Sequence, residues 1–241
     1  MNSNRKTAII VGVLYIAATV AGILSVVSLG SVLDGPDFLV TVSANKNQVI
    51  MAALFELIMA VAVAGVAFMI YPILKKNSEV REGLALWYVG SRITEGVLFL
   101  VGVLGQLSIL TLSQEFVKAG APDASYFQTG GNVLLVVSDN AWMLGQTVFC
   151  LGALMLYYLL YQSKLIPRWL SVWGLIGAPL MLAAGLLPLL FGEDPNSTLS
   201  NALYFPLASQ EMVFAVWLIV KGFNSSSIVS GSAKTDINEI K

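Results

Sequence analysis

The 241-residue chain has no histidine, one cysteine and few charged residues. Without histidine, imidazole acid–base catalysis, haem ligation by histidine and the common zinc sites are excluded. Because Cys150 is the only cysteine, an intramolecular disulfide is excluded as well. The formal net charge of −1 leaves no basic surface for nucleic acid. The chain also lacks a P-loop, a dinucleotide-binding glycine motif and a G-x-S-x-G motif.

Charged residues make up 11% of the chain, less than half of the roughly 25% found in soluble domains. Hydrophobic residues make up 57%, the mean hydropathy is +0.80, and the apolar residues form long runs. A membrane-spanning helix needs about 20 such residues. Six segments meet this length, so the sequence predicts an all-α bundle of six transmembrane helices within residues 1–223. The predicted spans are Thr7–Leu29, Gln48–Leu74, Gly83–Leu112, Gly131–Tyr161, Trp169–Phe191 and Ala202–Lys221.

Lysine and arginine alternate between the two sides of these spans. Eight flank the spans on the side that holds both termini, and two, Lys46 and Lys118, lie on the other side. The positive-inside rule therefore predicts that both termini are cytoplasmic. A cleaved signal peptide is the alternative for the first span, but its apolar stretch exceeds the usual ~7–15 residues. Residues 224–241 hold too few apolar side chains to fold alone and are predicted to be a disordered cytoplasmic tail.

Five charged residues fall inside predicted spans, where each costs about 2.5–3.5 kcal/mol on insertion scales. We expect them to face the bundle interior, and their depths place all five in one polar layer between the midplane and the outer third of the membrane. They are Glu56, Arg92, Glu95, Asp139 and Glu211.

Spacing along the helices supports a common polar site. Arg92 and Glu95 are three residues apart, and Asp139 and Gln146 are seven apart, so each pair shares one helix face. One arginine against four carboxyl groups would give −3 if all were ionised, so either some carboxyls hold a proton or a cation completes the site. The buried charges alternatively only lock helix packing. The predicted site comprises Glu56, Arg92, Glu95, Asp139, Asn140, Gln146 and Glu211.

Four motifs, in order along the chain, resemble a bacterial integral-membrane family known as domain-of-unknown-function family 4386. They are Tyr71–Lys76, the Arg92-x-x-Glu95 pair, Ala121–Tyr126 and Leu165–Ser171. The resemblance covers about residues 6–223 and implies a multi-pass protein of the bacterial plasma membrane. It implies no activity and no functional residues.

Three classes of function remain for such a chain. The first is a small transporter or a ligand- or cation-binding protein with an outward-facing polar cavity. The second is a non-catalytic sensor, immunity or accessory protein in which the charges are structural. An intramembrane enzyme is the third and is disfavoured, because histidine is absent and no second deep aspartate opposes Asp139. We expect no cofactor; the expected partners are the lipid bilayer and a small cation, proton or small molecule, while a metal and an oligomer stay open.

Overall fold

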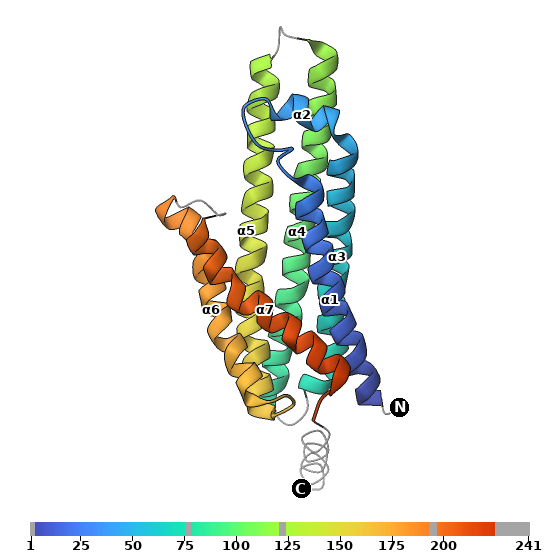
Figure 1. The fold of residues 1–241 in the computed structure, drawn as a ribbon, viewed down its shortest axis with the longest axis vertical. Coiled ribbons are helices and arrows are strands. Elements are labelled where there is room, and N and C mark those ends of the chain that lie inside the picture. The colour runs from blue at the N-terminus through green and yellow to red at the C-terminus, as the bar shows by residue number, and fades with distance from the viewer. Residues whose placement is uncertain (1–2, 76–78, 121–123, 193–196, 225–241) are drawn as a thin grey trace. The chain divides into compact units, whose positions relative to one another are not determined.

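The computed structural model describes residues 3–75, 79–120, 124–192 and 197–224. These residues form seven α-helices and no strand (Figure 1). The predicted tail at 225–241 lies outside the described residues. The helices are α1 (Ser3–Leu29), α2 (Phe38–Ala44), α3 (Lys46–Leu74), α4 (Glu79–Ala119), α5 (Ala124–Ser163), α6 (Arg168–Phe191) and α7 (Thr198–Val220).

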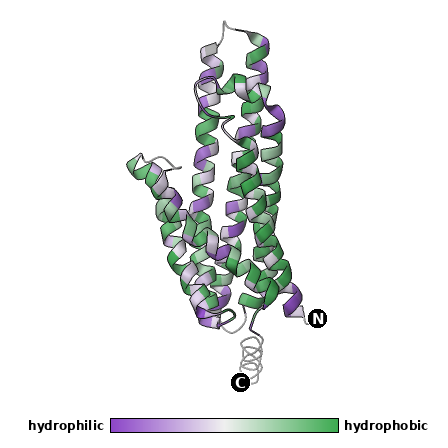
Figure 2. Ribbon diagram, viewed as in Figure 1, coloured by the Kyte–Doolittle hydropathy of each residue, from purple (hydrophilic) through white to green (hydrophobic). Residues whose placement is uncertain are grey.

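Six of the described helices, all except α2, are long and apolar enough to cross a membrane. They coincide in order with the six predicted spans, so the prediction of an all-α membrane bundle is confirmed. Figure 2 shows hydrophobic residues along the length of these helices. Helices are the natural solution for such segments, because a helix pairs all of its backbone polar groups within the segment.

Helices α4 and α5 are longer than a bilayer requires, with 41 and 40 residues. The predicted span ends at Leu112, whereas α4 continues unbroken to Ala119. Nothing before Gly120 interrupts it, and Gly120 itself has φ +76°, the left-handed conformation that commonly ends helices. An ion pair between Lys118 and Glu115, 2.8 Å long, lies in the last turns of α4.

Contacts within the chain group its residues into two compact units. Unit 1 comprises Met1–Ile16, Ala62–Glu95 and Gln146–Lys241, and unit 2 comprises Ala17–Val61 and Gly96–Gly145. Helices α1, α3, α4 and α5 each contribute a segment to both units. Each unit has its own apolar core.

In unit 1, glycines let neighbouring helices approach closely. Gly174 of α6 packs on the Tyr157 ring of α5, since a Cβ there would lie 2.5 Å from the ring. Gly177 of α6 lies against the backbone of Leu207 in α7 in the same way, and Figure 1 shows these two helices side by side. Small residues at such contacts are typical of membrane helices, because they bring the backbones close together.

In unit 2, the short helix α2 covers the other core. Its residues Phe38, Leu39 and Val42 are fully buried. Gly131 of α5 provides the space, because a Cβ at this position would lie 2.7 Å from the Phe38 ring. Sequence analysis did not predict α2, since seven residues are too few to span a membrane or to show a helical period.

Arg5 connects the first and last helices of unit 1. Its Nη1 donates to the carbonyl oxygen of Leu218 at 2.9 Å, and its Nη2 donates to those of Ile219 and Val220. These carbonyls belong to the last turn of α7, where no intrahelical donor remains and the helix dipole favours a positive charge. The start of α1 and the end of α7 therefore lie together in unit 1.

Arg5→Gln is expected to destabilise the protein by about 0.5–2 kcal/mol, the range of a lost helix cap. The reason is that three terminal carbonyls lose a charged donor. Thermal unfolding in detergent measures the effect. Lys6→Gln is the matched control, because Lys6 is exposed and neighbours Arg5; equal losses in both variants would contradict the capping role.

Candidate functional site

The central feature of unit 1 is an ion pair on α4. Arg92 Nη1 lies 2.9 Å from Glu95 Oε2 and 3.2 Å from Glu95 Oε1. Both residues are only 3% exposed. The three-residue spacing places them on one helix face, as the sequence indicated, and the pair is present in the structure. An ion pair this deeply buried is costly to break, because the remaining partner would be an uncompensated charge.

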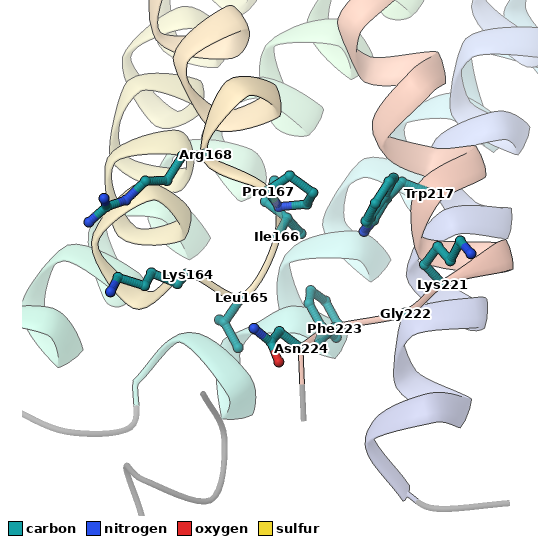
Figure 3. Close-up of a pocket in the computed structure, with 10 residues that line it drawn as sticks. All are labelled: Lys164, Leu165, Ile166, Pro167, Arg168, Trp217, Lys221, Gly222, Phe223 and Asn224. Atoms are coloured by element: carbon teal, nitrogen blue, oxygen red, sulfur yellow. The ribbon is translucent and has the colours of Figure 1, made fainter. Parts of the chain in front are cut away.

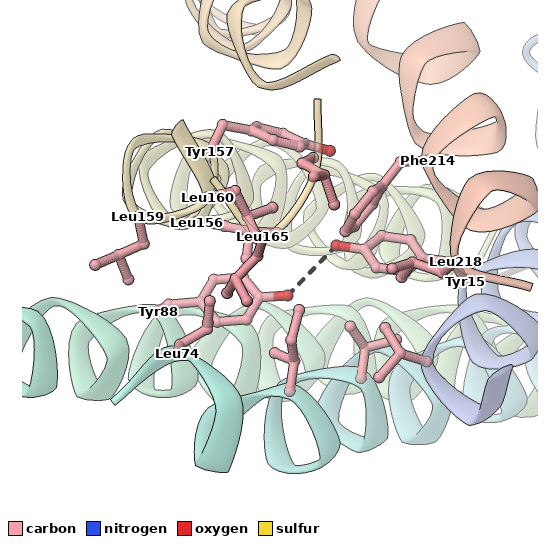
Figure 4. Packing of buried hydrophobic residues seen from close by; sticks show 14 of the residues in the cluster. Tyr15, Leu74, Tyr88, Leu156, Tyr157, Leu159, Leu160, Leu165, Phe214 and Leu218 are labelled. Atoms are coloured by element: carbon pink, nitrogen blue, oxygen red, sulfur yellow. Dashed lines mark hydrogen bonds between the residues drawn. The ribbon is translucent and has the colours of Figure 1, made fainter. Parts of the chain in front are cut away.

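Aromatic rings surround the Arg92 guanidinium group. Its Cζ atom lies 4.9 Å from the ring centre of Phe149, 5.7 Å from that of Tyr15 and 6.0 Å from that of Tyr88. The two tyrosine hydroxyl groups share a hydrogen bond of 3.4 Å, and Figure 4 shows them pointing toward each other. Desolvated cation–π contacts stabilise an arginine by about 2 kcal/mol. The rings therefore replace part of the hydration that Arg92 loses.

Glu211 of α7 adds a second carboxyl group to this part of unit 1. It interacts electrostatically with Arg92 and with Glu95, and it is half-buried. Among the described residues it forms no ion pair within 4 Å. Arg92, Glu95 and Glu211 together carry −1 if all are ionised. The structure thus brings three of the predicted site residues together, with two carboxyl groups for one guanidinium group.

Gln146 also belongs to unit 1 but faces another helix. Its Nε2 donates to the carbonyl oxygen of Met181 in α6 at 3.3 Å. Gly185 leaves room for it, since a Cβ there would lie 2.5 Å from the same Nε2. The described contacts of Gln146 therefore connect α5 to α6.

Glu56 is the central polar residue of unit 2. It is 2% exposed, and its Oε1 accepts hydrogen bonds from Ser25 Oγ at 2.9 Å and from Gln106 Nε2 at 3.0 Å. Trp142 also acts on the same carboxyl group, but among the described contacts its indole N–H makes no direct hydrogen bond to Glu56. Donors from α1 and α4 thus converge on one residue of α3, and Trp142 of α5 acts on the same group. We call Glu56, Ser25, Gln106 and Trp142 the Glu56 cluster.

Asp139 and Asn140 of unit 2 have exposed side chains. The expectation that all five charged membrane residues face the bundle interior is therefore wrong for Asp139. The physical reason is helix rotation: Ser138, one residue earlier, is the buried position, and its Oγ donates to the Gly102 carbonyl oxygen at 3.1 Å. Neighbouring residues on a helix point about 100° apart, so burying Ser138 turns Asp139 outward.

Sequence analysis missed several residues of these two sites. Tyr15, Phe149, Ser25 and Trp142 carry no periodicity or charge that sets them apart from ordinary membrane residues. Tyr88 had a usable signal, because it precedes Arg92 by four residues and so shares its helix face. Cys150 is buried, as expected of a small apolar residue.

Unit 1 also contains a cavity of about 460 Å³ beside the turn between α5 and α6. Its lining includes the basic residues Lys164, Arg168 and Lys221, and also Trp217. Figure 3 shows the side chains of Lys164 and Arg168 extending away from Trp217, and Arg168 Cζ lies 5.2 Å from the ring centre of Tyr161. None of the predicted acidic site residues lines this cavity.

No group of three or more histidine, cysteine, aspartate or glutamate residues in the described part of the chain is placed to hold a metal ion. The chemistry available at both sites is instead that of carboxyl groups, amides, hydroxyl groups and one guanidinium group. Such groups bind protons and small cations and form hydrogen bonds.

Comparison with known proteins gives one match. The family model described as a domain of unknown function (DUF4386) matches residues 10–222. No curated protein and no solved structure matches the chain. The matched range covers all six candidate membrane spans almost completely. The chain therefore belongs to the DUF4386 family, and its six candidate spans make it a multi-pass helical membrane protein.

Proposed function

We propose that this protein is a small membrane carrier or binding protein that takes a monovalent cation, or a small ligand with one positive charge, at Arg92, Glu95 and Glu211. The observation that carries the proposal is the charge of this site. Arg92 pairs with Glu95, so the carboxyl group of Glu211 is left without an ion-pair partner among the described residues. A charge in a low-dielectric site is costly unless it is paired.

The summed charge of Arg92, Glu95 and Glu211 also limits the charge of the ligand. A ligand with one positive charge brings the three residues to neutrality, whereas a divalent ion would leave an excess of positive charge beside a guanidinium that stays protonated. Glu211 is the less buried of the two carboxyl residues at this site. Glu95, which is 3% exposed, holds Arg92 in place.

A second candidate function is that of a non-catalytic accessory or sensor protein in which these charges are structural. The observation in its favour is the environment of Arg92, whose ion pair and three aromatic neighbours together resemble a cross-link between α1, α4 and α5. In that case no small cation changes the stability of the protein.

We also propose that the protein lies in the bacterial plasma membrane with both termini in the cytoplasm. The support is that Arg5 contacts the end of α7, and that the cavity lined by Lys164, Arg168 and Lys221 includes that same end of the helix. Basic residues at one end of a helical unit are typical of its cytoplasmic side.

The test is thermal unfolding of the detergent-purified protein with Na⁺, K⁺, ammonium and small organic amines at constant ionic strength. A ligand at 100 times its Kd stabilises the folded state by about 2.7 kcal/mol. We expect one cation to raise the Tm of the wild type and to leave that of Glu211→Gln unchanged. Glu115→Gln is the control, because Glu115 is an exposed carboxylate of α4; an equal shift in all three proteins would refute the proposal.

A further inference from the structure

The carboxyl group of Glu56 is buried in unit 2, and no described residue places a positive charge beside it. Its Oε1 accepts two hydrogen bonds, from Ser25 Oγ and Gln106 Nε2. The described groups that act on it are uncharged: Ser25 from α1, Gln106 from α4 and Trp142 from α5. Asp139, the other carboxyl group of unit 2 inside a membrane span, is exposed and exerts no electrostatic effect on Glu56. An ionised carboxylate in these surroundings would be a buried, uncompensated charge.

Two buried oxygen atoms of this cluster lack a hydrogen-bond partner among the described residues. They are Glu56 Oε2 and Gln106 Oε1. Both residues are at least 97% buried, at 2% and 3% exposure. An amide oxygen accepts and never donates. One proton can satisfy both oxygen atoms if it is bonded to Glu56 Oε2 and donated to Gln106 Oε1.

A carboxylic acid supplies that donor and removes the charge at the same time. The amide of Gln106 already donates from Nε2 to Glu56 Oε1 at 3.0 Å. Glu56 Oε2 is bonded to the same carbon as Oε1, which accepts this hydrogen bond. Gln106 Oε1 is likewise bonded to the same carbon as Nε2, which donates it. A proton on Oε2 therefore allows a second, parallel hydrogen bond and a cyclic acid–amide pair.

We propose that Glu56 is a proton-binding site, in which Oε2 carries a proton and donates it to Gln106 Oε1. The site is separate from the cation site proposed above, because it belongs to the other unit and uses other residues. Protonatable residues inside membrane spans are typical of proton-coupled proteins. Release of this proton leaves a bare carboxylate among neutral groups, so proton binding and the packing of α1, α3, α4 and α5 in unit 2 are linked.

A metal cation fits the Glu56 cluster less well than a proton. Hard cations such as Ca²⁺ and Mg²⁺ take about six or more oxygen ligands. The cluster offers four side-chain oxygen atoms, those of Glu56, Gln106 and Ser25, and the Ser25 hydroxyl is already engaged as a donor. One proton, in contrast, satisfies both unpartnered oxygens.

Glu56→Gln is the decisive variant, because a neutral amide reproduces the proposed acid: its oxygen accepts from Ser25 and Gln106, and its NH₂ donates to Gln106 Oε1. We expect it to fold with a Tm close to that of the wild type at neutral pH. As the pH rises, the wild type should lose stability, by up to about tenfold in its folding equilibrium per pH unit for one released proton. Over the same pH range Glu56→Gln should lose less stability than the wild type, and the difference should correspond to the release of one proton. Asp139→Asn should lose as much stability as the wild type.

Infrared spectroscopy of the full-length protein gives a second readout. The wild type should show the carbonyl band of a neutral carboxylic acid that is absent from Glu56→Gln and present in Asp139→Asn. Gln106→Met, which removes the acceptor, should keep this band and shift it to higher frequency because the hydrogen bond weakens. The proposal is overturned if no acid band disappears in Glu56→Gln. It is also overturned if Na⁺ or K⁺ stabilises the wild type but not this variant, which would identify an ionised carboxylate that holds a metal ion.

Discussion

Arg92→Gln is expected to lower the free energy of unfolding by about 3–5 kcal/mol, the range for breaking a buried ion pair from one side. Glu95 would be left at 3% exposure with no cation beside it, so its carboxyl group would either stay charged without a partner or have to take up a proton. The loss should be larger than that of any exposed charge, because exposed pairs contribute at most about 1 kcal/mol. Thermal or denaturant unfolding in detergent measures the difference.

A double-mutant cycle separates the charge effect from packing. In Arg92→Gln/Glu95→Gln neither side chain is charged, so we expect the double variant to be more stable than Arg92→Gln alone. Double-mutant coupling between residues in contact is typically about 0.5–3 kcal/mol. Simple additivity of the two single losses would show that the ion pair contributes nothing beyond its separate packing contacts.

Gly12→Ala is expected to destabilise unit 1 by about 1–3 kcal/mol, the usual cost of overpacking a core. A Cβ at this position would lie 2.6 Å from the carbonyl oxygen of Ala215 in α7 and 2.7 Å from Cγ1 of Ile219. The first of these atoms belongs to the backbone, so relief requires that α1 and α7 move apart. Such a movement also strains the hydrogen bonds of Arg5 to the end of α7.

Gly90→Ala is the matched control for Gly12→Ala. Gly90 lies within α4 and is exposed, and a Cβ added there would have open space within 4 Å, apart from its chain neighbours and the adjoining backbone of α4. Alanine is the better helix former by about 1 kcal/mol, so this variant should be as stable as the wild type or slightly more stable. Thermal unfolding of the two variants under one set of conditions tests the pair, and equal Tm values would show that the close contact of α1 with α7 is relieved without cost.

Much of the fold follows from composition and apolar runs. In a bilayer, an apolar segment of about 20 residues has few alternatives to a helix, because unpaired backbone groups in hydrocarbon are costly. The six spans are therefore readable from the chain. The ends of α4 and α5 cannot be predicted from the apolar runs, because a helix continues past the membrane until a residue such as Gly120 ends it. The thickness of the membrane does not determine where that residue lies.

The candidate sites also follow in part from the sequence and in part only from the tertiary structure. The spacing of Arg92 and Glu95 indicates their pairing, since residues three apart lie on one helix face, and the structure contains the pair. The aromatic neighbours Tyr15 and Phe149 belong to other helices. No local pattern connects them to Arg92, because the contact depends on how the helices are rotated and packed.

The sequence thus shows which charges must be accommodated in the membrane, and tertiary structure shows how each is accommodated. Composition and hydropathy suffice for the first, since a charge inside an apolar run is visible without coordinates. Helix rotation decides the second: it pairs Arg92 with aromatic rings, surrounds Glu56 with neutral donors and turns Asp139 outward. Rotation depends on interlocking contacts such as those of Gly12 and Gly174, which involve residues distant in the chain.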